Sequence, residues 1–152
     1  MEFIQFLDKI EIEIIRMVEE VGYSIEENTA LCLSSDNYVG FLKKKEKMIV
    51  ICTENAKKRE FYTLLSRRDT NRFERTATHI KKALRHESIH VAQECNDGKL
   101  LNIKEKLSMN PAKLRALEGS SKISGKEEKE RQAYILEDMP KLVKRELIKY
   151  CL

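Results

Sequence analysis

The pentapeptide His86-Glu87-Ser88-Ile89-His90 constrains the fold of this chain more than any other part of its sequence. It has the H-E-x-x-H spacing, which places both histidines on one face of an α-helix, one turn apart. Two imidazoles in that arrangement can both bind a single ion, with each nitrogen about 2.0–2.1 Å from it. The intervening glutamate is then directed toward the open coordination position of that ion. The spacing therefore predicts a helix that carries a zinc site. A surface helix with two solvated histidines is the alternative interpretation.

The residue types of this pattern favour hydrolysis. Zinc lowers the pKa of a bound water from about 15.7 to about 7. A neighbouring carboxylate can accept the proton of that water and pass it to a leaving amine, which is the role that we expect for Glu87. The predicted function is therefore that of a zinc-dependent metallopeptidase, a hydrolase with Zn²⁺ as its cofactor and a protein or peptide as its substrate.

Length and composition indicate one domain over residues 1–152. A chain of 152 residues is long enough to bury about 68–70% of its unfolded surface when it folds. Hydrophobic residues make up 41% of the chain and charged residues 36%, with 5 glycines and 2 prolines. This composition suits a compact, helix-rich protein and excludes a disordered one.

Cysteine usage and the N-terminal residues bear on the cellular compartment. Four cysteines occur without C-x-x-C spacing, which indicates neither a thiolate zinc finger nor a disulfide framework: Cys32, Cys52, Cys95 and Cys151. The first eight residues carry acids where a signal peptide carries Lys or Arg, and no apolar run approaches the roughly 18 residues of a membrane span. We expect a cytoplasmic protein with reduced thiols and no membrane partner.

The charge of the chain is unevenly distributed. Residues 1–28 hold eight acids against Lys9 and Arg16, a balance of −6, whereas residues 57–85 have a balance of +7. A basic segment of this kind could bind nucleic acid. Because no aromatic residues are regularly interleaved for base stacking, a solvated or internally paired face is the favoured interpretation.

The hydrophobic pattern predicts an α+β fold. Apolar residues at spacings of three and four predict a helix over 2–21 that ends near Gly22. The pattern then changes to short apolar runs, which are typical of strands. We expect these runs to form a three-stranded antiparallel sheet: 30–33, 38–42 and 48–52.

Helices are predicted for most of the remaining chain. One short helix is expected within 54–66. A long helix should begin at Asp69 or Thr70, carry the H-E-x-x-H pattern, and end near Cys95 before Asn96-Asp97-Gly98. The other predicted helices run from Asn110-Pro111 to Gly119, over 126–138, and over 141–151 after Pro140.

A catalytic zinc site needs a third protein ligand besides His86 and His90. The metzincin pattern would need Gly at 93 and His at 96, but the chain has Gln93 and Asn96, which excludes that class. The third histidine, His79, precedes His86 by seven residues, roughly 10 Å along a helix axis. It cannot share the ion, so the third ligand should be a carboxylate.

The segment 130–133, Glu-Arg-Gln-Ala, supplies a candidate carboxylate. Together with the H-E-x-x-H pattern and the later Met139-Pro140, it resembles the gluzincin-like ImmA/IrrE-like family of zinc peptidases, in which E-x-[EQ]-A follows. The resemblance implies a minimal zincin-like domain in which Glu130 is the third zinc ligand and Ala133 lets two helices approach. The stretch before Met139-Pro140 is shorter than in the family, so three further glutamates stay open as ligands: Glu127, Glu128 and Glu137.

Three residues are candidates for accessory roles in such a site. Zincins often place a Tyr, His or Arg donor where the oxyanion develops. His79 and Tyr134 are the candidates, together with Tyr150. The resemblance further implies that a substrate peptide lies along the sheet edge nearest the motif helix.

Two other classes of function stay open. One is a nucleic-acid-associated protein that binds phosphates through residues 57–85, which a steep salt dependence of DNA affinity would favour. The other is a non-catalytic interaction protein on a zincin scaffold, which would bind metal tightly and leave no coordination position for water.

Overall fold

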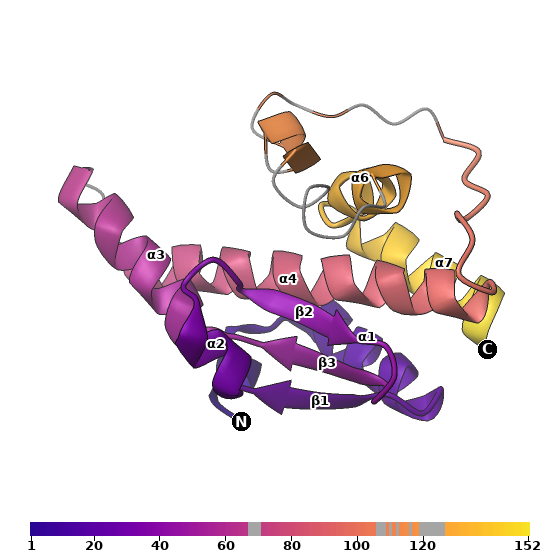
Figure 1. The fold of residues 1–152 in the computed structure, drawn as a ribbon, viewed down its shortest axis with the longest axis horizontal. Coiled ribbons are helices and arrows are strands. Elements are labelled where there is room, and N and C mark those ends of the chain that lie inside the picture. The colour runs from indigo at the N-terminus through magenta and orange to yellow at the C-terminus, as the bar shows by residue number, and fades with distance from the viewer. Residues whose placement is uncertain (67–70, 106–108, 110, 112, 116, 119–126) are drawn as a thin grey trace.

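The computed structural model of the chain has the predicted α+β class, with helices packed against a small three-stranded sheet (Figure 1). The structure describes residues 1–66, 71–105, 109, 111, 113–115, 117–118 and 127–152, and of residues 60–66 the backbone alone. The helices are η1 (Glu2–Phe6), α1 (Lys9–Glu20), α2 (Ala30–Ser34), α3 (Thr53–Ser66), α4 (Arg72–Cys95), α6 (Glu127–Leu136) and α7 (Pro140–Cys151). The strands are β1 (Ser24–Glu27), β2 (Gly40–Lys43) and β3 (Met48–Ile51).

The sheet is mixed, so the expectation of an antiparallel sheet is wrong for one of its pairings. Its strand order is β1-β3-β2. β2 and β3 form an antiparallel hairpin in which Gly40 pairs with Ile51. β1 pairs with β3 in parallel, with Ser24 opposite Met48. The connection from β1 to its parallel partner β3 contains both the helix α2 and the strand β2.

The first strand also differs from its prediction. The apolar run at 30–33 forms the helix α2, and Leu33 at 76% exposure shows that this run does not mark a buried strand. The strand β1 lies earlier, and Ile25 is its buried residue. One apolar residue gives no alternating signal, so pairing with β3 specifies this strand more than its own hydrophobicity does.

The N-terminal helix predicted over 2–21 is divided into η1 and α1. Leu7 is extended between them, and Asp8 caps α1 in a capping box with Glu11. The backbone N–H of Asp8 donates to the Glu11 carboxylate at 3.1 Å. The division lets Phe3 turn into the core, where it is fully buried.

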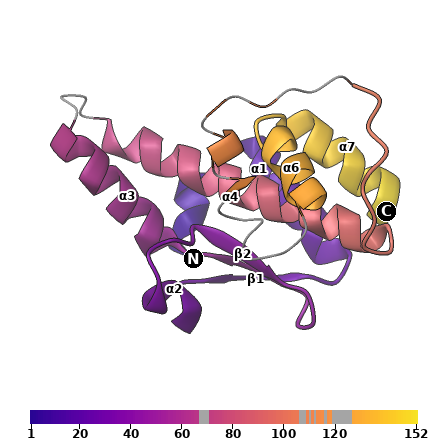
Figure 2. The ribbon, with the colours of Figure 1, turned by 45° about the horizontal axis from the view of Figure 1, so that its top comes forward.

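Helix α4 is the central element of the fold. It runs between the sheet and the C-terminal helices α6 and α7, and it also packs against η1, α1 and α3 (Figure 2). Its apolar face contributes Ile80, Leu84, Ile89 and Val91 to the main core, all fully buried. The sheet supplies Ile49 and Ile51 to the same core. The motif helix is therefore fixed on several sides, as a helix that presents a rigid site must be.

The ends of the helices follow local sequence signals. Asn71 caps α4 by accepting a hydrogen bond from the Glu74 N–H at 3.2 Å. The predicted end near Cys95 is confirmed, and Asp97 and Gly98 after it have positive φ values of 56° and 73°. The predicted caps Asp69 and Thr70, and the predicted helix bounds Asn110 and Gly119, lie outside the described residues.

All four cysteines are paired, so the expectation of reduced thiols is wrong. Cys32 of α2 bonds to Cys52 after β3, with Cα atoms 5.4 Å apart. Cys95, the last residue of α4, bonds to Cys151, the last residue of α7, with Cα atoms 5.3 Å apart. The members of each pair are 20 and 56 residues apart in the chain. Only the tertiary fold brings them together, which is why their spacing gave no signal.

None of the described helices combines the length and the apolar character needed to cross a bilayer.

Candidate metal centre

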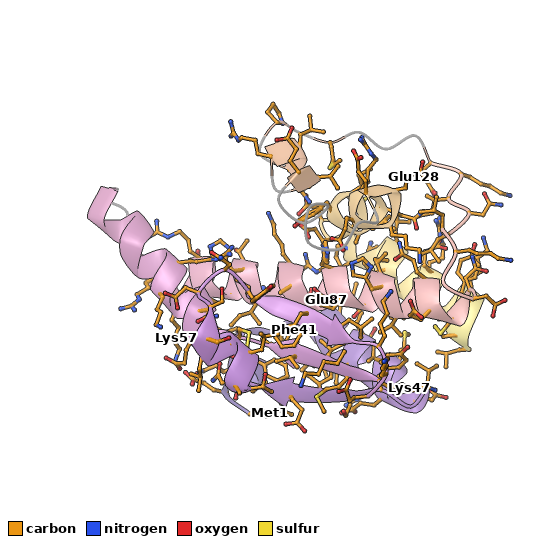
Figure 3. All side chains as sticks on the ribbon, in the orientation of Figure 1. Met1, Phe41, Lys47, Lys57, Glu87 and Glu128 are labelled. Atoms are coloured by element: carbon orange, nitrogen blue, oxygen red, sulfur yellow. A yellow bond between two sulfur atoms is a disulfide. The ribbon has the colours of Figure 1, made fainter. Side chains whose placement is uncertain are left out.

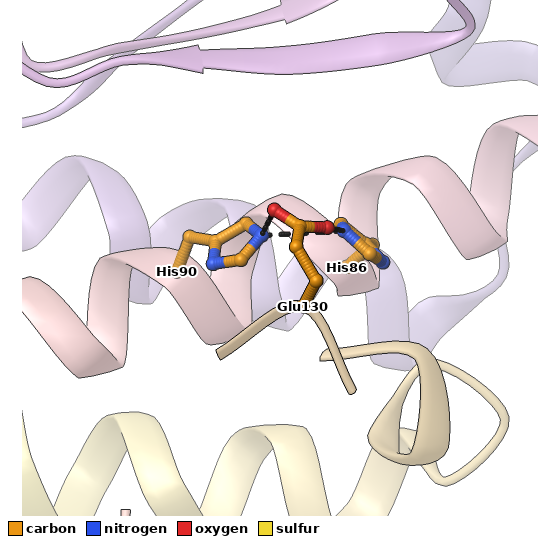
Figure 4. A group of neighbouring side chains, drawn as sticks. All are labelled: His86, His90 and Glu130. Atoms are coloured by element: carbon orange, nitrogen blue, oxygen red, sulfur yellow. Dashed lines mark hydrogen bonds and ion pairs between the residues drawn. The ribbon is translucent and has the colours of Figure 1, made fainter. Parts of the chain in front are cut away.

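Two helices bring three metal-ligating side chains together. His86 and His90 lie one turn apart on α4, and Glu130 reaches them from α6 (Figure 4). One oxygen of Glu130 lies 3.1 Å from His86 Nε2 and the other lies 3.1 Å from His90 Nε2. The two histidine nitrogens are 3.2 Å apart. The residues predicted as zinc ligands thus converge from segments forty positions apart.

These separations can be compared with the geometry of a zinc site. A tetrahedral ion with bonds of about 2.0–2.1 Å has ligand atoms roughly 3.3 Å apart. The two histidine nitrogens are 3.2 Å apart, close to that value, and one ligand atom from each of the three residues lies within 4.8 Å of the other two. Two histidines and one glutamate are also a donor set of catalytic zinc sites, which keep the fourth position for water. The residues present therefore fit a zinc ion.

Glu87 lies beside these ligands, on the side of α4 that faces β2 (Figure 3). A Cβ added at Gly40 of β2 would lie 3.6 Å from Glu87 Cγ and 3.1 Å from Ala83 Cβ. The glycine therefore lets the edge strand approach the motif helix closely. Burial raises the pKa of the Glu87 carboxyl, and His86 and His90 offset that increase only in part. A carboxyl with a raised pKa is suited to accept and release a proton near neutral pH.

The pKa values of the ligands reflect their mutual contacts. Burial alone would lower the pKa of His86, but its hydrogen bonds with Glu130 and Glu137 raise it to about 10. Burial would raise the pKa of Glu130, yet its hydrogen bonds with both histidines hold it well below its usual range. The carboxylate is thus kept in the ionised form that binds a metal.

Each histidine has a partner on its other ring nitrogen. His86 Nδ1 lies 3.0 Å from an oxygen of Glu137, and His90 Nδ1 lies 2.8 Å from Gln93 Oε1. The Gln93 amide group donates to the Lys129 carbonyl at 3.2 Å and to Gln132 Oε1 at 3.1 Å. Sequence reasoning considered Gln93 only as a departure from the metzincin pattern and missed its contact with a histidine three residues away.

The structure places the other candidate ligands differently. Glu127 and Glu128 are exposed on α6. Glu137 contacts His86 through Nδ1, on the opposite side of the ring from Glu130. Among the described residues, Glu130 is thus the glutamate that shares a cluster with both histidine Nε2 atoms.

The three accessory candidates have different surroundings. The Tyr134 ring packs edge-on against the His86 ring, with centroids 4.5 Å apart. His79 is half-buried on α4 and outside the cluster of His86, His90 and Glu130. Tyr150 accepts a hydrogen bond from the Asn102 N–H at 2.8 Å, away from this cluster. Tyr134 is therefore the tyrosine that the fold brings to the site.

Several basic residues in the described part of the segment 57–85 are paired with acids from other parts of the chain. Lys81 contacts Asp8 at 2.7 Å, and Lys58 contacts Asp36 at 3.1 Å. Further pairs link this segment to acids elsewhere: Lys57 with Glu2, Lys82 with Asp138, and Arg85 with Glu11. These contacts agree with the interpretation of an internally paired face.

Comparisons with known proteins give a family. Residues 3–152 match the family described as "Domain of unknown function (DUF8637)". The chain belongs to this family. No curated protein and no solved structure matches the chain. Because the family's description names no activity, the function of this DUF8637 member has to be argued from its site.

Proposed function

We propose that the protein is a zinc-dependent metallopeptidase whose ion is held by His86, His90 and Glu130. The convergence of Glu130 on the two histidines of the H-E-x-x-H helix is the observation that supports this proposal most strongly. The spacing of the motif by itself places the two histidines together, whereas the carboxylate comes from a separate helix. We further propose that the chain is a gluzincin-like peptidase similar to the ImmA/IrrE-like family, which its sequence resembles.

The residues of the site have distinct roles in this proposal. A bound zinc ion supplies a Lewis acid and lowers the pKa of water from about 15.7 to about 7. Glu87 accepts the proton of the attacking water and delivers it to the leaving amine. The raised pKa of the Glu87 carboxyl favours the first of these transfers, because a carboxylate with a higher pKa is the stronger base. Tyr134, packed on His86, is the candidate donor to the developing oxyanion.

The substrate is proposed to be an extended peptide that adds to the edge strand β2. This strand is at one edge of the sheet in the order β1-β3-β2, and its Gly40 lies against α4 near Glu87. Main-chain hydrogen bonds to an edge strand hold a peptide in an extended conformation. A peptide along β2 would therefore have its backbone beside Glu87.

Metal analysis tests the ligands. Protein purified without chelators should contain about one zinc per chain, as expected for one three-ligand site. His86→Ala should abolish zinc binding, and His79→Ala provides a matched control on the same helix that should keep it. Absence of zinc from the unaltered protein would overturn the proposal.

Cleavage of a random peptide library, followed by mass spectrometry, tests the reaction. Glu87→Gln should keep the zinc and lower the cleavage rate by roughly 10²- to 10⁴-fold, as expected when a general base is lost. Equal cleavage by this variant would remove Glu87 from the mechanism. A zinc-loaded protein that cleaves nothing in the library would favour the non-catalytic alternative.

A further inference from the structure

Glu137 lies directly behind His86, on the side away from the proposed ion. Its Oε2 is 3.0 Å from His86 Nδ1, while His86 Nε2 faces Glu130 and His90. The two nitrogens lie on opposite sides of the imidazole ring. Glu137 therefore cannot join the three ligand atoms while His86 keeps its orientation, and it contacts the histidine instead.

The carboxylate of Glu137 is itself held in place. Its second oxygen accepts a hydrogen bond from Lys113 Nζ at 3.0 Å. Its backbone N–H donates to the Ala133 carbonyl at 3.0 Å, and its own carbonyl accepts from Arg85 Nη1 at 3.1 Å. Arg85 directly precedes His86 on α4 and is fixed by the buried Glu11, whose Oε1 lies 2.8 Å from Arg85 Nε. The side chain and the backbone of Glu137 are thus both anchored.

An acceptor at Nδ1 determines which nitrogen of a neutral imidazole carries the proton. With the proton on Nδ1 and donated to Glu137, the lone pair of His86 is on Nε2 and directed toward Glu130 and His90. His90 has an uncharged acceptor, Gln93, in the corresponding place. Each histidine therefore has a partner at Nδ1, which is a carboxylate for His86 and an uncharged amide for His90.

A carboxylate suits the position of Glu137 better than an amide does. Both of its oxygens face donors, His86 Nδ1 on one side and Lys113 Nζ on the other. A glutamine has one oxygen and one NH₂ group, so it can accept from only one of these donors and presents hydrogens to the other. Glu137→Gln therefore removes an acceptor while it keeps the shape of the side chain.

We propose that Glu137 is a positioning residue, which holds His86 in the orientation and tautomer that bind zinc and so sets the metal affinity of the site. This inference rests on the proposed zinc site. Loss of a residue that supports a metal ligand typically weakens metal binding by roughly 10- to 100-fold. Glu137→Gln and Glu137→Ala are expected to weaken zinc binding within that range.

Competition with a chromophoric chelator measures the zinc dissociation constant of the unaltered protein and each variant. Asp138→Asn is the matched control, because Asp138 also contacts Lys113, at 2.8 Å, but is not a partner of His86. It should bind zinc within about threefold of the unaltered protein, well below the range expected for Glu137. Thermal unfolding of the metal-free proteins checks that Glu137→Gln is folded.

Cobalt substitution separates a positioning role from direct ligation. At saturating Co²⁺, the visible spectrum of Glu137→Gln should keep the shape of the unaltered protein's spectrum, because the ligand set is unchanged. A changed spectrum would overturn the positioning role in favour of ligation by Glu137. If the Glu137 variants bind zinc within about threefold of the unaltered protein, short of the expected range, the positioning role is overturned while the zinc site stands. Absence of metal binding by the unaltered protein would overturn the site itself.

Discussion

Removal of the Cys95–Cys151 disulfide should lower the free energy of unfolding substantially. The bond joins residues 56 positions apart, and in the chain-entropy model closing a loop of that size stabilises the fold by about 4 kcal/mol at 25 °C. Cys32 and Cys52 are 20 positions apart, for which the same model gives about 3 kcal/mol. The double variant Cys95→Ala with Cys151→Ala should therefore lose more stability than Cys32→Ala with Cys52→Ala.

Urea unfolding measures both losses. The proteins are refolded in a glutathione redox buffer, so that thiols can pair before the measurement. Alkylation of the urea-unfolded, unreduced protein followed by mass spectrometry then counts free thiols, and none is expected because all four cysteines are paired. Four alkylated thiols, or double variants as stable as the unaltered protein, would refute the pairing. Disulfides form and persist mainly in oxidising compartments. The two disulfides therefore argue against the predicted cytoplasmic location.

Three further changes should have measurable effects. Gly40→Ala should cost about 1–3 kcal/mol of stability, because the added Cβ would lie 3.1 Å from Ala83 Cβ. Urea unfolding measures this loss, and an unchanged midpoint would contradict it. Metal-free protein should lose stability as pH rises from 6.5 to about 10, because folding raises the pKa of His86 from the first of these values to the second. Thermal unfolding across this range should show the decline, and constant stability would contradict it. Glu11→Ala should cost about 3 kcal/mol of stability, because it leaves Arg85 without its buried carboxylate. A loss below about 1 kcal/mol in urea unfolding would show that the ion pair is dispensable.

Local sequence signals were sufficient for the helices α4, α6 and α7, but not for α2, whose residues were predicted to form a strand. The position of α4 follows from its apolar periodicity and from the stop at Asn96-Asp97-Gly98, and α6 and α7 follow from their patterns on either side of Pro140. The strand β1 could not be found in this way. Its buried face is a single residue, Ile25, and its place depends on a parallel partner more than twenty residues later.

The candidate site was only partly readable from the chain. The H-E-x-x-H spacing identified His86 and His90, and the resemblance, not the spacing, selected Glu130. The role of Glu137 as a contact of His86 was missed. A signal for it exists, because Glu130 and Glu137 are seven residues apart within the helix predicted over 126–138, and a spacing close to two helical turns places both on one side of that predicted helix. Such a pair can contact the two ring nitrogens of one histidine, but only coordinates show that it does.

Arg85 gives the fold a consequence for protein engineering. This residue, next to His86, bonds to Glu11 of α1 and to the carbonyl of Glu137 between α6 and α7. Segments from the beginning, middle and end of the chain therefore meet beside one proposed ligand. A fragment from α4 to α7 would contain every proposed ligand and still lack Glu11 and the sheet that packs on α4. We therefore expect the smallest fragment that keeps the proposed metal site to include α1 as well as α4 to α7.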